Sequence, residues 1–423
     1  MTNKKFNNWF NRQKKNNKIK VEIIDINKAS NWKVNKDEIF HISKKFFKII
    51  GIKVNTNFFK KNWDQPIIIQ NELGILGIIK DPKKNKYLLQ AKFEPGNKNK
   101  IQLSPTVQAT KSNFNQIHGG KKVPYLSLFL KHRKKDIFNQ SEQGFRYLYK
   151  FNSNILVNSK MNIKTLPSFF WFKLPELVKM IRKKNLLNMD TLSVISSHIK
   201  LNKLDKPINS TKFIEQWFKK KDKKFFIKSK IISLSKLKDW IFNYKKIVHK
   251  NNDHFSVIAI NVETNKREVN SWCQPIIRGK NLALSGFIIK KFNNTDHYLC
   301  RYILKPGLKK SALTCTVNTG NIKNFNKDKN LPNIQKKLLR KFFLNKKYKK
   351  SKIFDNIMSD EGGRFFHSEI RYLGLSINDD IGINLPSNYI WVSQNQLIKM
   401  IKKKKFDIEG RLLFGCLNIS NLT

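Results

Sequence analysis

The side chains best suited to chemistry lie in one polar run, LLQAKFEPGNKNKIQLSPTVQATKSNFNQIHGGKKVPYL, which spans residues 88–126. Two predicted strands in this run carry amide, carboxylate, ammonium and hydroxyl groups at every second position. These are Gln90, Lys92 and Glu94 on one strand and Gln102, Ser104, Thr106 and Gln108 on the next. Residues two apart face the same side of a sheet. The pattern therefore predicts two adjoining polar stripes, either a reactive surface or the solvated side of a sheet.

Four residues of the run are candidates for proton transfer and charge stabilisation: Lys92, Glu94, His118 and Tyr125. Glu94 or His118 could serve as a general base, since a carboxylate or an imidazole can accept a proton near neutral pH. Lys92 could hold an oxyanion or a phosphate oxygen, and Tyr125 could donate a proton. The alternatives are a Glu94–Lys92 salt bridge, a solvated Lys92, a surface His118 and a core Tyr125.

Three residue types recur at matching places in both halves of the chain and are candidates for binding a substrate. They are Trp63 and Trp272, Gln65 and Gln274, and Arg146 and Arg364, joined by Gln90, Gln108 and Thr110 of the polar run. The tryptophans could stack on a base or belong to a core, and the glutamines could bond a ligand or buried backbone. An arginine could clamp a pyrophosphate with two hydrogen bonds, or pair with Glu142 or Glu361.

These matches belong to a tandem repeat. NWDQPIII near Trp63 corresponds to SWCQPIIR near Trp272, and Gly77 corresponds to Gly286. FEPG (93–96) matches LKPG (304–307), LSPTVQ (103–108) matches LTCTVN (313–318), and SEQGFRY (141–147) matches SDEGGRF (359–365). The offset changes only where loops are expected, so we infer a duplication with a first repeat at 1–203, a connector at 204–225 and a second repeat at 226–423.

Each repeat must position its polar residues on a similar set of elements. We expect a helical opening (31–45; 239–250), an apolar strand (46–54; 254–262), the Trp-x-Gln-Pro strand and a hairpin (74–96 in the first repeat). Apolar residues at helical spacing predict helices at 175–183 and 188–199, and the connector is expected to be partly helical. Strands and helices mix without regular alternation, which favours an α+β fold class.

The composition is typical of a folded protein and argues against nucleic acid or a membrane as its partner. Of 423 residues 40% are hydrophobic, and the formal net charge is +56. The basic residues are nearly all Lys and are spread along the chain together with abundant Asn, Ile and Phe, which indicates compositional drift more than a nucleic-acid interface. The N-terminus lacks the apolar run of a signal peptide, and the four cysteines show no CxxC spacing. We therefore expect a cytoplasmic protein in a reducing compartment, with no membrane partner.

The combination of motifs resembles the NDP-hexose 2,3-dehydratases, which act on dTDP-4-keto-6-deoxyglucose. The matching stretches are W-x-Q-P-I-I-x-Q-x-E-x-G-I-L-G from Trp63, LLQAKFEPGN, QLSPTVQAT, HGGKKVPYL, SEQGFR, LPSFFW and NMD, followed by SWCQPII and SDEGGRFFHSEIRYLGL in the second half. The resemblance implies two Nudix-like mixed-sheet units with flanking helices, a homodimer and a nucleotide-sugar pocket in each repeat. It also implies a reaction without metal, pyridoxal phosphate or nicotinamide, so no cofactor is expected.

The resemblance gives the candidate residues specific roles. A C4 ketone acidifies the C3 proton, so Glu94 or His118 would remove that proton, Lys92 would stabilise the C4 oxyanion and Tyr125 would protonate the departing C2 hydroxyl. Neither repeat contains the Glu-rich helix G-x5-E-x7-R-E-x2-E-E with which Nudix hydrolases hold magnesium. Pyrophosphate hydrolysis is therefore not expected.

The second repeat departs from the pattern that the first one keeps. Arg301, Ile303 and Lys305 replace Gln90, Lys92 and Glu94, and Cys315 and Asn318 replace Pro105 and Gln108. We therefore expect catalysis in the first repeat, with the second ancillary, or a weakened enzyme. Two other functions stay open: another reaction on a 4-keto nucleotide sugar, such as epimerisation, and a polyanion-binding scaffold without enzymatic activity.

Overall fold

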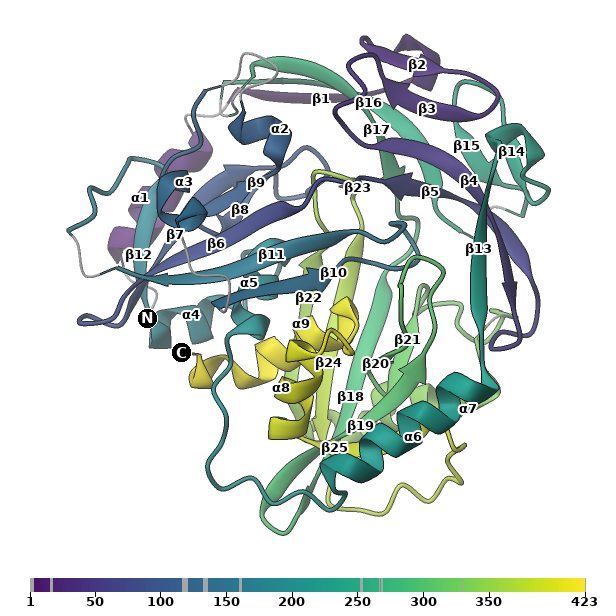
Figure 1. Cartoon of the computed structure of the whole chain (residues 1–423). Coiled ribbons are helices and arrows are strands. Elements are labelled where there is room, and N and C mark those ends of the chain that lie inside the picture. The colour runs from purple at the N-terminus through teal and green to yellow at the C-terminus, as the bar shows by residue number, and fades with distance from the viewer. Residues whose placement is uncertain are drawn as a thin grey trace.

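The computed structural model describes residues 4–15, 18–115, 121–131, 136–159, 162–251, 254–265, 267, 269–329 and 331–422. Over these residues each repeat contributes a smaller and a larger β-sheet, with helices packed on the larger one (Figure 1). The fold is thus a tandem of mixed α+β units, as the sequence predicted.

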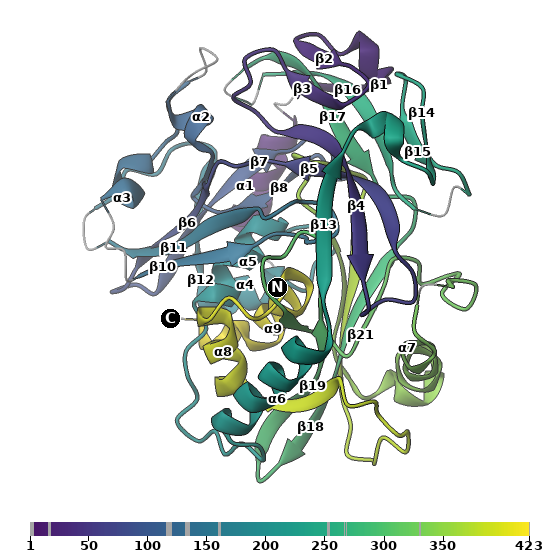
Figure 2. The same ribbon diagram turned by 45° about the vertical axis from the view of Figure 1, so that its right-hand side comes forward.

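The two smaller sheets exchange a strand between the repeats. In the first, β2 (Trp32–Val34), β3 (Glu38–His41), β4 (Lys48–Thr56) and β5 (Trp63–Ile69) are joined by β13 (Ile227–Ile232) of the second repeat. In the other, β14 (Trp240–Phe242), β15 (Ile247–His249), β16 (Ser256–Thr264), β17 (Ser271–Arg278) and β23 (Phe365–Phe366) are joined by β1 (Ile19–Ile24) of the first repeat. Figures 1 and 2 show β1 beside β16 and β13 beside β4. Each small sheet therefore needs both halves of the chain.

The larger sheets carry the polar run and its counterpart. The first contains β6 (Gly74–Asp81), β7 (Lys86–Phe93), β8 (Ile101–Ser104), β9 (Val107–Ala109), β10 (Ile137–Ser141), β11 (Phe151–Asn158) and β12 (Phe169–Lys173). The second contains β18 (Ala283–Phe292), β19 (Thr295–Ile303), β20 (Ala312–Thr314), β21 (Val317–Thr319), β22 (Lys352–Ser359), β24 (Glu369–Ser376) and β25 (Tyr389–Ser393). The equivalent pairs β6–β11 and β18–β24 are parallel, so both sheets are mixed.

Helices cover these sheets and fill the space between them. They are α1 (Lys4–Lys15), α2 (Lys111–Phe114), α3 (Leu126–Leu130), α4 (Leu174–Met180), α5 (Met189–Ser197), α6 (Thr211–Lys224), α7 (Asn333–Leu338), α8 (Gln394–Lys402) and α9 (Ile408–Asn418). Single turns occur at η1 (Ile26–Lys28), η3 (Leu234–Lys236), η4 (Leu339–Phe343), η5 (Lys346–Lys349) and η6 (Ile419–Asn421). The predicted helices at 175–183 and 188–199 correspond to α4 and α5, and the connector contains α6.

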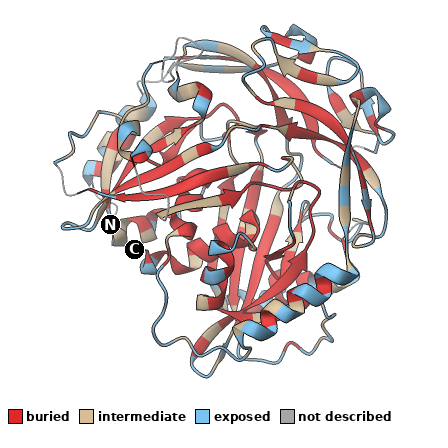
Figure 3. Cartoon of the chain, in the orientation of Figure 1, coloured by how far each residue is buried: buried red, intermediate tan, exposed pale blue. Residues whose placement is uncertain are grey.

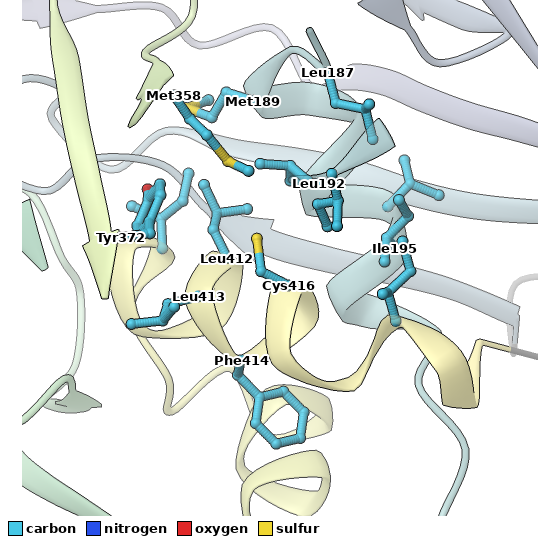
Figure 4. Close-up of a cluster of buried hydrophobic side chains, with 14 of the residues drawn as sticks. Leu187, Met189, Leu192, Ile195, Met358, Tyr372, Leu412, Leu413, Phe414 and Cys416 are labelled. Atoms are coloured by element: carbon cyan, nitrogen blue, oxygen red, sulfur yellow. The ribbon is translucent and has the colours of Figure 1, made fainter. Parts of the chain in front are cut away.

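Helices α5 and α9, one from each repeat, lie side by side at the centre of the molecule. Figure 4 shows Leu192 and Ile195 of α5 near Leu412 and Cys416 of α9, all within one continuous buried core. The helix N-termini are capped in the same way, since the side chain of Asn188 accepts from Thr191 N and that of Asp407 accepts from Gly410 N. Burial is deepest in the central strands and in these two helices (Figure 3).

Two details of the sequence prediction were wrong. The segments 31–45 and 239–250 are not helical but form the paired strands β2–β3 and β14–β15. Contacts across the repeats decide this conformation, because the indole of Trp32 donates to Cys273 O and that of Trp240 donates to Asp64 O, both at 2.8 Å. The polar stretch 102–108 is also split into β8 and β9.

Candidate substrate site where the repeats meet

The polar stripes of the first repeat are largely buried, so they are not the solvated side of a sheet. Lys92 is 8% exposed, Glu94 2% and Gln102 1%. Glu94, which follows β7, accepts hydrogen bonds from Gln108 Nε2 at 2.7 Å and from Asn97 Nδ2 at 3.2 Å. The structure therefore brings together the carboxylate of one predicted polar stripe and an amide of the other.

A continuous hydrogen-bond network surrounds Glu94. Gln108 Oε1 accepts from Ser104 Oγ at 2.9 Å and from Asn188 Nδ2 at 3.2 Å, while Lys92 Nζ donates to Gln108 O at 2.9 Å. Buried polar networks of this kind hold their side chains in fixed positions, because each broken bond leaves an unsatisfied group. Lys92 and Glu94 are thus linked through Gln108, which favours this arrangement over a direct salt bridge between them.

The second repeat closes this network with the loop 359–364. The Gly362 N–H donates to Glu94 Oε2 at 3.2 Å, and the Gly96 N–H donates to Gly362 O at 2.7 Å. A Cβ atom on Gly96 would lie 2.0 Å from Phe365 O, so the approach of the two backbones requires glycine there. The site of the first repeat is therefore built from both halves of the chain.

Three further buried carboxyl groups have raised pKa values, and two of them, Asp190 and Glu361, interact electrostatically with Glu94. Burial raises the pKa of Glu142 to about 7, and it raises the pKa of Asp190 well above the ordinary range, with the charges of Glu361 and Glu94 acting in the same direction. Burial also raises the pKa of Glu361, against the charge of Arg364. The Tyr147 hydroxyl donates to Glu361 Oε2 at 2.5 Å. Two carboxyl groups with raised pKa values, Asp190 and Glu361, therefore lie near enough to Glu94 to feel its charge.

The equivalent place in the second repeat is filled by a buried ion triad. Lys305, at the position of Glu94, lies 2.8 Å from Asp407 Oδ2 and 2.5 Å from Glu409 Oε2. Burial acts to lower the pKa of Lys305, but the two carboxylates outweigh it and raise that pKa. The Gly307 N–H donates to Gly144 O at 2.7 Å, which mirrors the contact of Gly96. The geometry is kept while the charge of the central residue is inverted.

The two recurring arginines stack on aromatic rings of the opposite repeat. The guanidinium of Arg146 lies 4.0 Å from the ring centre of Phe255, and that of Arg364 lies 4.2 Å from that of Phe47. Burial lowers the pKa of Arg146 to about 10 against the charges of Asp360 and Glu409. Arg364 Nη2 donates to Gln70 Oε1 at 3.4 Å. A pyrophosphate contact from either arginine stays a prediction.

In both repeats the side chains of the Trp-x-Gln motif form hydrogen bonds with each other and with the backbone. Trp63 Nε1 donates to Gln65 Oε1 at 2.8 Å, and Gln65 Nε2 donates to Phe145 O at 2.7 Å. Trp272 and Gln274 repeat the pattern at 2.8 Å, with Gln274 Nε2 donating to Gly363 O at 2.7 Å. These bonds favour the structural alternative for the glutamines, which anchor the loops 141–147 and 359–365.

The remaining predicted residues lie around the network. The Tyr125 hydroxyl donates to Lys164 O at 2.7 Å and accepts from Leu166 N at 3.1 Å, so it holds the segment before β12. Thr110 Oγ1 donates to Asn113 Oδ1 at 2.7 Å at the start of α2, and Gln90 is half-buried on β7 opposite Ser104. His118 lies outside the described residues.

Sequence reasoning missed three residues that join the network around Glu94 from distant segments. Asn188 and Asp190 lie at the start of α5, and Glu361 lies in the loop after β22. Asn188 and Asp190 belong to the NMD stretch, which was noted in the family resemblance, and Glu361 belongs to SDEGGRF, which was noted in the repeat. The available signal was a carboxylate inside a motif, but only the fold shows that these segments meet at one place.

A family model described as NDP-hexose 2,3-dehydratase matches residues 3–197 and again residues 211–417. The chain belongs to the NDP-hexose 2,3-dehydratase family. Among its relatives in this family, a dTDP-4-dehydro-6-deoxy-α-D-glucopyranose 2,3-dehydratase of Saccharopolyspora spinosa is 29% identical, over 98% of this chain and 90% of the relative. The enzyme of the same name from Streptomyces violaceoruber is 30% identical, over 97% and 96%. Both matches extend across the two repeats.

Two solved structures are similar to a smaller part of this NDP-hexose 2,3-dehydratase family member. The Ap4A hydrolase of C. elegans has 13% identity and a TM-score of 0.19, covering 30% of this chain and 86% of the hydrolase. An ADP compounds hydrolase has 12% identity and a TM-score of 0.22, covering 34% and 75%. Similarities this low do not identify an activity. Within the described residues, no helix has both the length and the apolar character needed to cross a membrane.

Proposed function

We propose that this protein dehydrates a dTDP-linked 4-keto-6-deoxyhexose across C2 and C3, in deoxysugar biosynthesis. Its family and the names of its relatives support this substrate class. The observation that carries the proposal is the buried Glu94, which is held by Gln108, Asn97 and Gly362. Its charge acts on two buried carboxyl groups with raised pKa values, Asp190 and Glu361. Neighbouring carboxyl groups with different proton affinities are the usual arrangement for an acid and a base in one site.

The reaction then divides among residues of this network. Glu94 accepts the C3 proton, and the electron pair of that C–H bond forms an enolate whose C4 oxygen is stabilised by Lys92. Asp190, with a raised pKa, gives its proton to the C2 hydroxyl, which leaves as water when the C2–O bond breaks. The resulting enol converts to a 3,4-diketo-2,6-dideoxy sugar. His118 remains the second candidate base, and Arg146 or Arg364 the candidates for the pyrophosphate.

In this proposal the site around Glu94 is productive and the site around Lys305 is ancillary. A base is needed at the position of Glu94, whereas Lys305 is already paired with Asp407 and Glu409. We further expect the protein to form a homodimer in the cytoplasm, which light scattering of the purified protein and cell fractionation would check.

Replacing Glu94 with Gln tests the assignment of the base. The glutamine keeps the shape of the side chain but cannot take up the C3 proton, so turnover of dTDP-4-keto-6-deoxyglucose should fall by about 10²-fold or more. Mass spectrometry of the product follows the loss of water, which separates dehydration from epimerisation. Glu263→Gln on the exposed part of β16 is the control, and His118→Ala examines the second base. Wild-type turnover in both Glu94→Gln and His118→Ala would refute a base in the first repeat.

Binding assays distinguish the enzyme from a polyanion-binding scaffold. A nucleotide sugar held by a buried site should stay bound at about 1 M salt, where exposed charges are screened beyond about 3 Å. Retention on DNA should be lost at the same salt. Retention of DNA together with loss of the nucleotide sugar would favour the scaffold.

A further inference from the structure

A cavity of about 370 Å³ lies on the smaller sheet of the second repeat, away from the residues of the Glu94 network. Its lining is Lys246, Val248, Ser256, Ile258, Arg278, Gly279 and Lys280. An adjoining cavity of about 310 Å³ shares Lys246 and Ile258 and adds Ile23, Ile24, Asp25, Lys28 and Lys245. We call the first of these the β16 cavity. Its charged lining residues are all basic, which sets it apart from the mixed charges around Glu94.

The first repeat provides an internal comparison for the β16 cavity. On β15 and β16, Val248 is paired with Ser256, and Ser256 is paired with Arg278 of β17. The equivalent pairs of the first repeat are Phe40 with Lys48, and Lys48 with Ile69. The first repeat therefore has the larger side chains of Phe40 and Lys48 where the second repeat has Val248 and Ser256. This difference gives the cavity its room.

The charge at the two places also differs. In the first repeat Lys48 Nζ forms an ion pair with Glu38 Oε2 at 2.7 Å. At the position of Glu38 the second repeat has Lys246, and at the position of Ile69 it has Arg278. Within the described residues, neither Lys246 nor Arg278 lies within ion-pair distance of a carboxylate. The ion pair of Glu38 and Lys48 in the first repeat has no equivalent in the second, which has two cationic side chains, Lys246 and Arg278, beside the β16 cavity.

The composition of the chain does not account for this pattern. Lysine is abundant along the whole chain, but arginine is rare, so Arg278 is not explained by a general excess of lysine. Such an excess would also not place Val248 and Ser256 at the positions that Phe40 and Lys48 occupy in the first repeat. The Ser256 hydroxyl, on a residue that is 4% exposed, gives the cavity wall a buried hydrogen-bond group. A guanidinium, ammonium groups and a hydroxyl together match the oxygens of a phosphate.

We propose that the β16 cavity binds a small phosphate-bearing anion through Arg278, Lys246 and Ser256. Its volume lies at the lower end of the range for small-molecule sites, which is about 300–1,000 Å³. Pyrophosphate, with its high charge and several acceptor oxygens, is the simplest probe. The site would be present once per chain, because the first repeat closes its equivalent with Glu38 and Lys48.

Calorimetric titration of the full chain with sodium pyrophosphate, at about 0.15 M salt, tests the proposal. We expect saturable binding to one site per chain. Two variants introduce the residue that the first repeat has at the equivalent position: Arg278→Ile, after Ile69, and Lys246→Glu, after Glu38. Each variant should weaken the binding of pyrophosphate by about tenfold or more. The matched controls are Lys33→Ile and Lys36→Glu, which make the same charge changes at exposed positions of the first repeat.

The outcomes separate a built site from general attraction to a basic protein. Binding that does not saturate, or that weakens equally in the control variants, would overturn the proposal. Saturating dTDP-4-keto-6-deoxyglucose should leave pyrophosphate binding unchanged. Displacement of pyrophosphate by the sugar nucleotide would place the anion in the site around Glu94 and would also overturn it. Unchanged melting temperatures of the variants show that each has folded.

Discussion

The turn after β7 and the equivalent turn after β19 make matching backbone contacts with the opposite repeat. One side chain in this turn carries opposite charges in the two repeats. Glu94 is held by amide and backbone donors, whereas Lys305 is held by Asp407 and Glu409. A lysine in so buried a place needs carboxylates beside it. The change at position 305 therefore explains why Asp407 and Glu409 occupy the positions of Asn188 and Asp190.

Replacing Lys305 with Met should destabilise the protein. The substitution leaves Asp407 and Glu409 buried without their cation, and removing one partner of a buried ion pair costs about 3–5 kcal/mol. The free energy of unfolding in denaturant measures the loss.

The triple variant Lys305→Met, Asp407→Asn, Glu409→Gln provides the comparison, because it removes the two unpaired charges as well. We expect it to recover most of the lost stability. A single variant as stable as the wild type would show that water reaches the triad and that the buried pairing does not matter.

Glu142 makes the stability of the protein depend on pH. Its pKa rises from 4.5 to about 7 in the folded state, mainly through burial, so the folded protein keeps this proton when the unfolded chain has lost it. The contribution is complete below about pH 4.5 and is lost as the pH rises through 7. It amounts to about 3 kcal/mol at most.

The variant Glu142→Gln should therefore have a flatter stability profile between pH 4.5 and 7 than the wild type. The introduced glutamine keeps an oxygen that can accept from Asn152 Nδ2, which donates to Glu142 Oε1 at 2.7 Å in the wild type. Chemical unfolding at several pH values measures the difference, and Glu263→Gln is the exposed control. Parallel profiles for Glu142→Gln and the wild type would contradict the raised pKa.

At the scale of elements, one glycine in each larger sheet makes room for an aromatic ring. A Cβ atom on Gly77 of β6 would lie 2.1 Å from Phe129 Cε1, and one on Gly286 of β18 would lie 2.2 Å from Phe343 Cε1. The repeat comparison matched these glycines without a reason for them. The reason is that Phe129 of α3 and Phe343 of η4 each pack against the bare backbone of a strand.

Replacing Gly286 with Ala should force Phe343 out of place and destabilise the protein by about 1–3 kcal/mol. Thermal unfolding measures the effect. The second substitution Phe343→Leu makes space for the new methyl group and should recover part of the loss. An unchanged melting temperature for Gly286→Ala would show that the ring moves without cost.

Local patterns predicted several elements of the fold. The hairpin of β6 and β7, the Trp-x-Gln-Pro strands and the helices α4 and α5 all follow from their periodicity, and so does the α+β class. The segments 31–45 and 239–250 were predicted wrongly, because Trp32 and Trp240 are fixed by backbone carbonyls of the opposite repeat. No local window contains such partners.

The same distinction between local and distant contacts explains which residues of the candidate site could be predicted from the sequence. Lys92 and Glu94 could be placed on one face because the strand period relates them, and Gln108 could be placed on the neighbouring polar stripe. The pairing of β9 with β6, which positions Gln108, was not predicted. Asp190 and Glu361 could not, since they reach Glu94 only through contacts between segments far apart in the sequence. The proposed boundaries at 203 and 226 also remain predictions, although α6 of the connector packs on the second repeat, where Trp217 Nε1 donates to Ser387 O at 3.0 Å.

At the scale of the molecule, neither repeat completes its own smaller sheet or its own site. The separate fragments 1–203 and 204–423 should each fail to fold, since each lacks a strand of its smaller sheet, and a mixture of the two should recover the native circular dichroism and sedimentation. As a control, the intact folded chain cut at the exposed Leu204, which is 78% exposed, should stay assembled. A fragment that unfolds cooperatively alone would contradict this interdependence.

The exchange of β1 and β13 sets an order of events during synthesis. Strand β1 leaves the ribosome before its partner β16, which ends at Thr264, so β1 must wait until the chain has been made through that residue. Contacts of such long sequence separation slow folding, and an unpaired strand edge is prone to aggregation while it waits. The charged side chains of Lys20 and Glu22 on the exposed face of β1, and the abundant charge near it, would keep that edge in solution until the second repeat emerges.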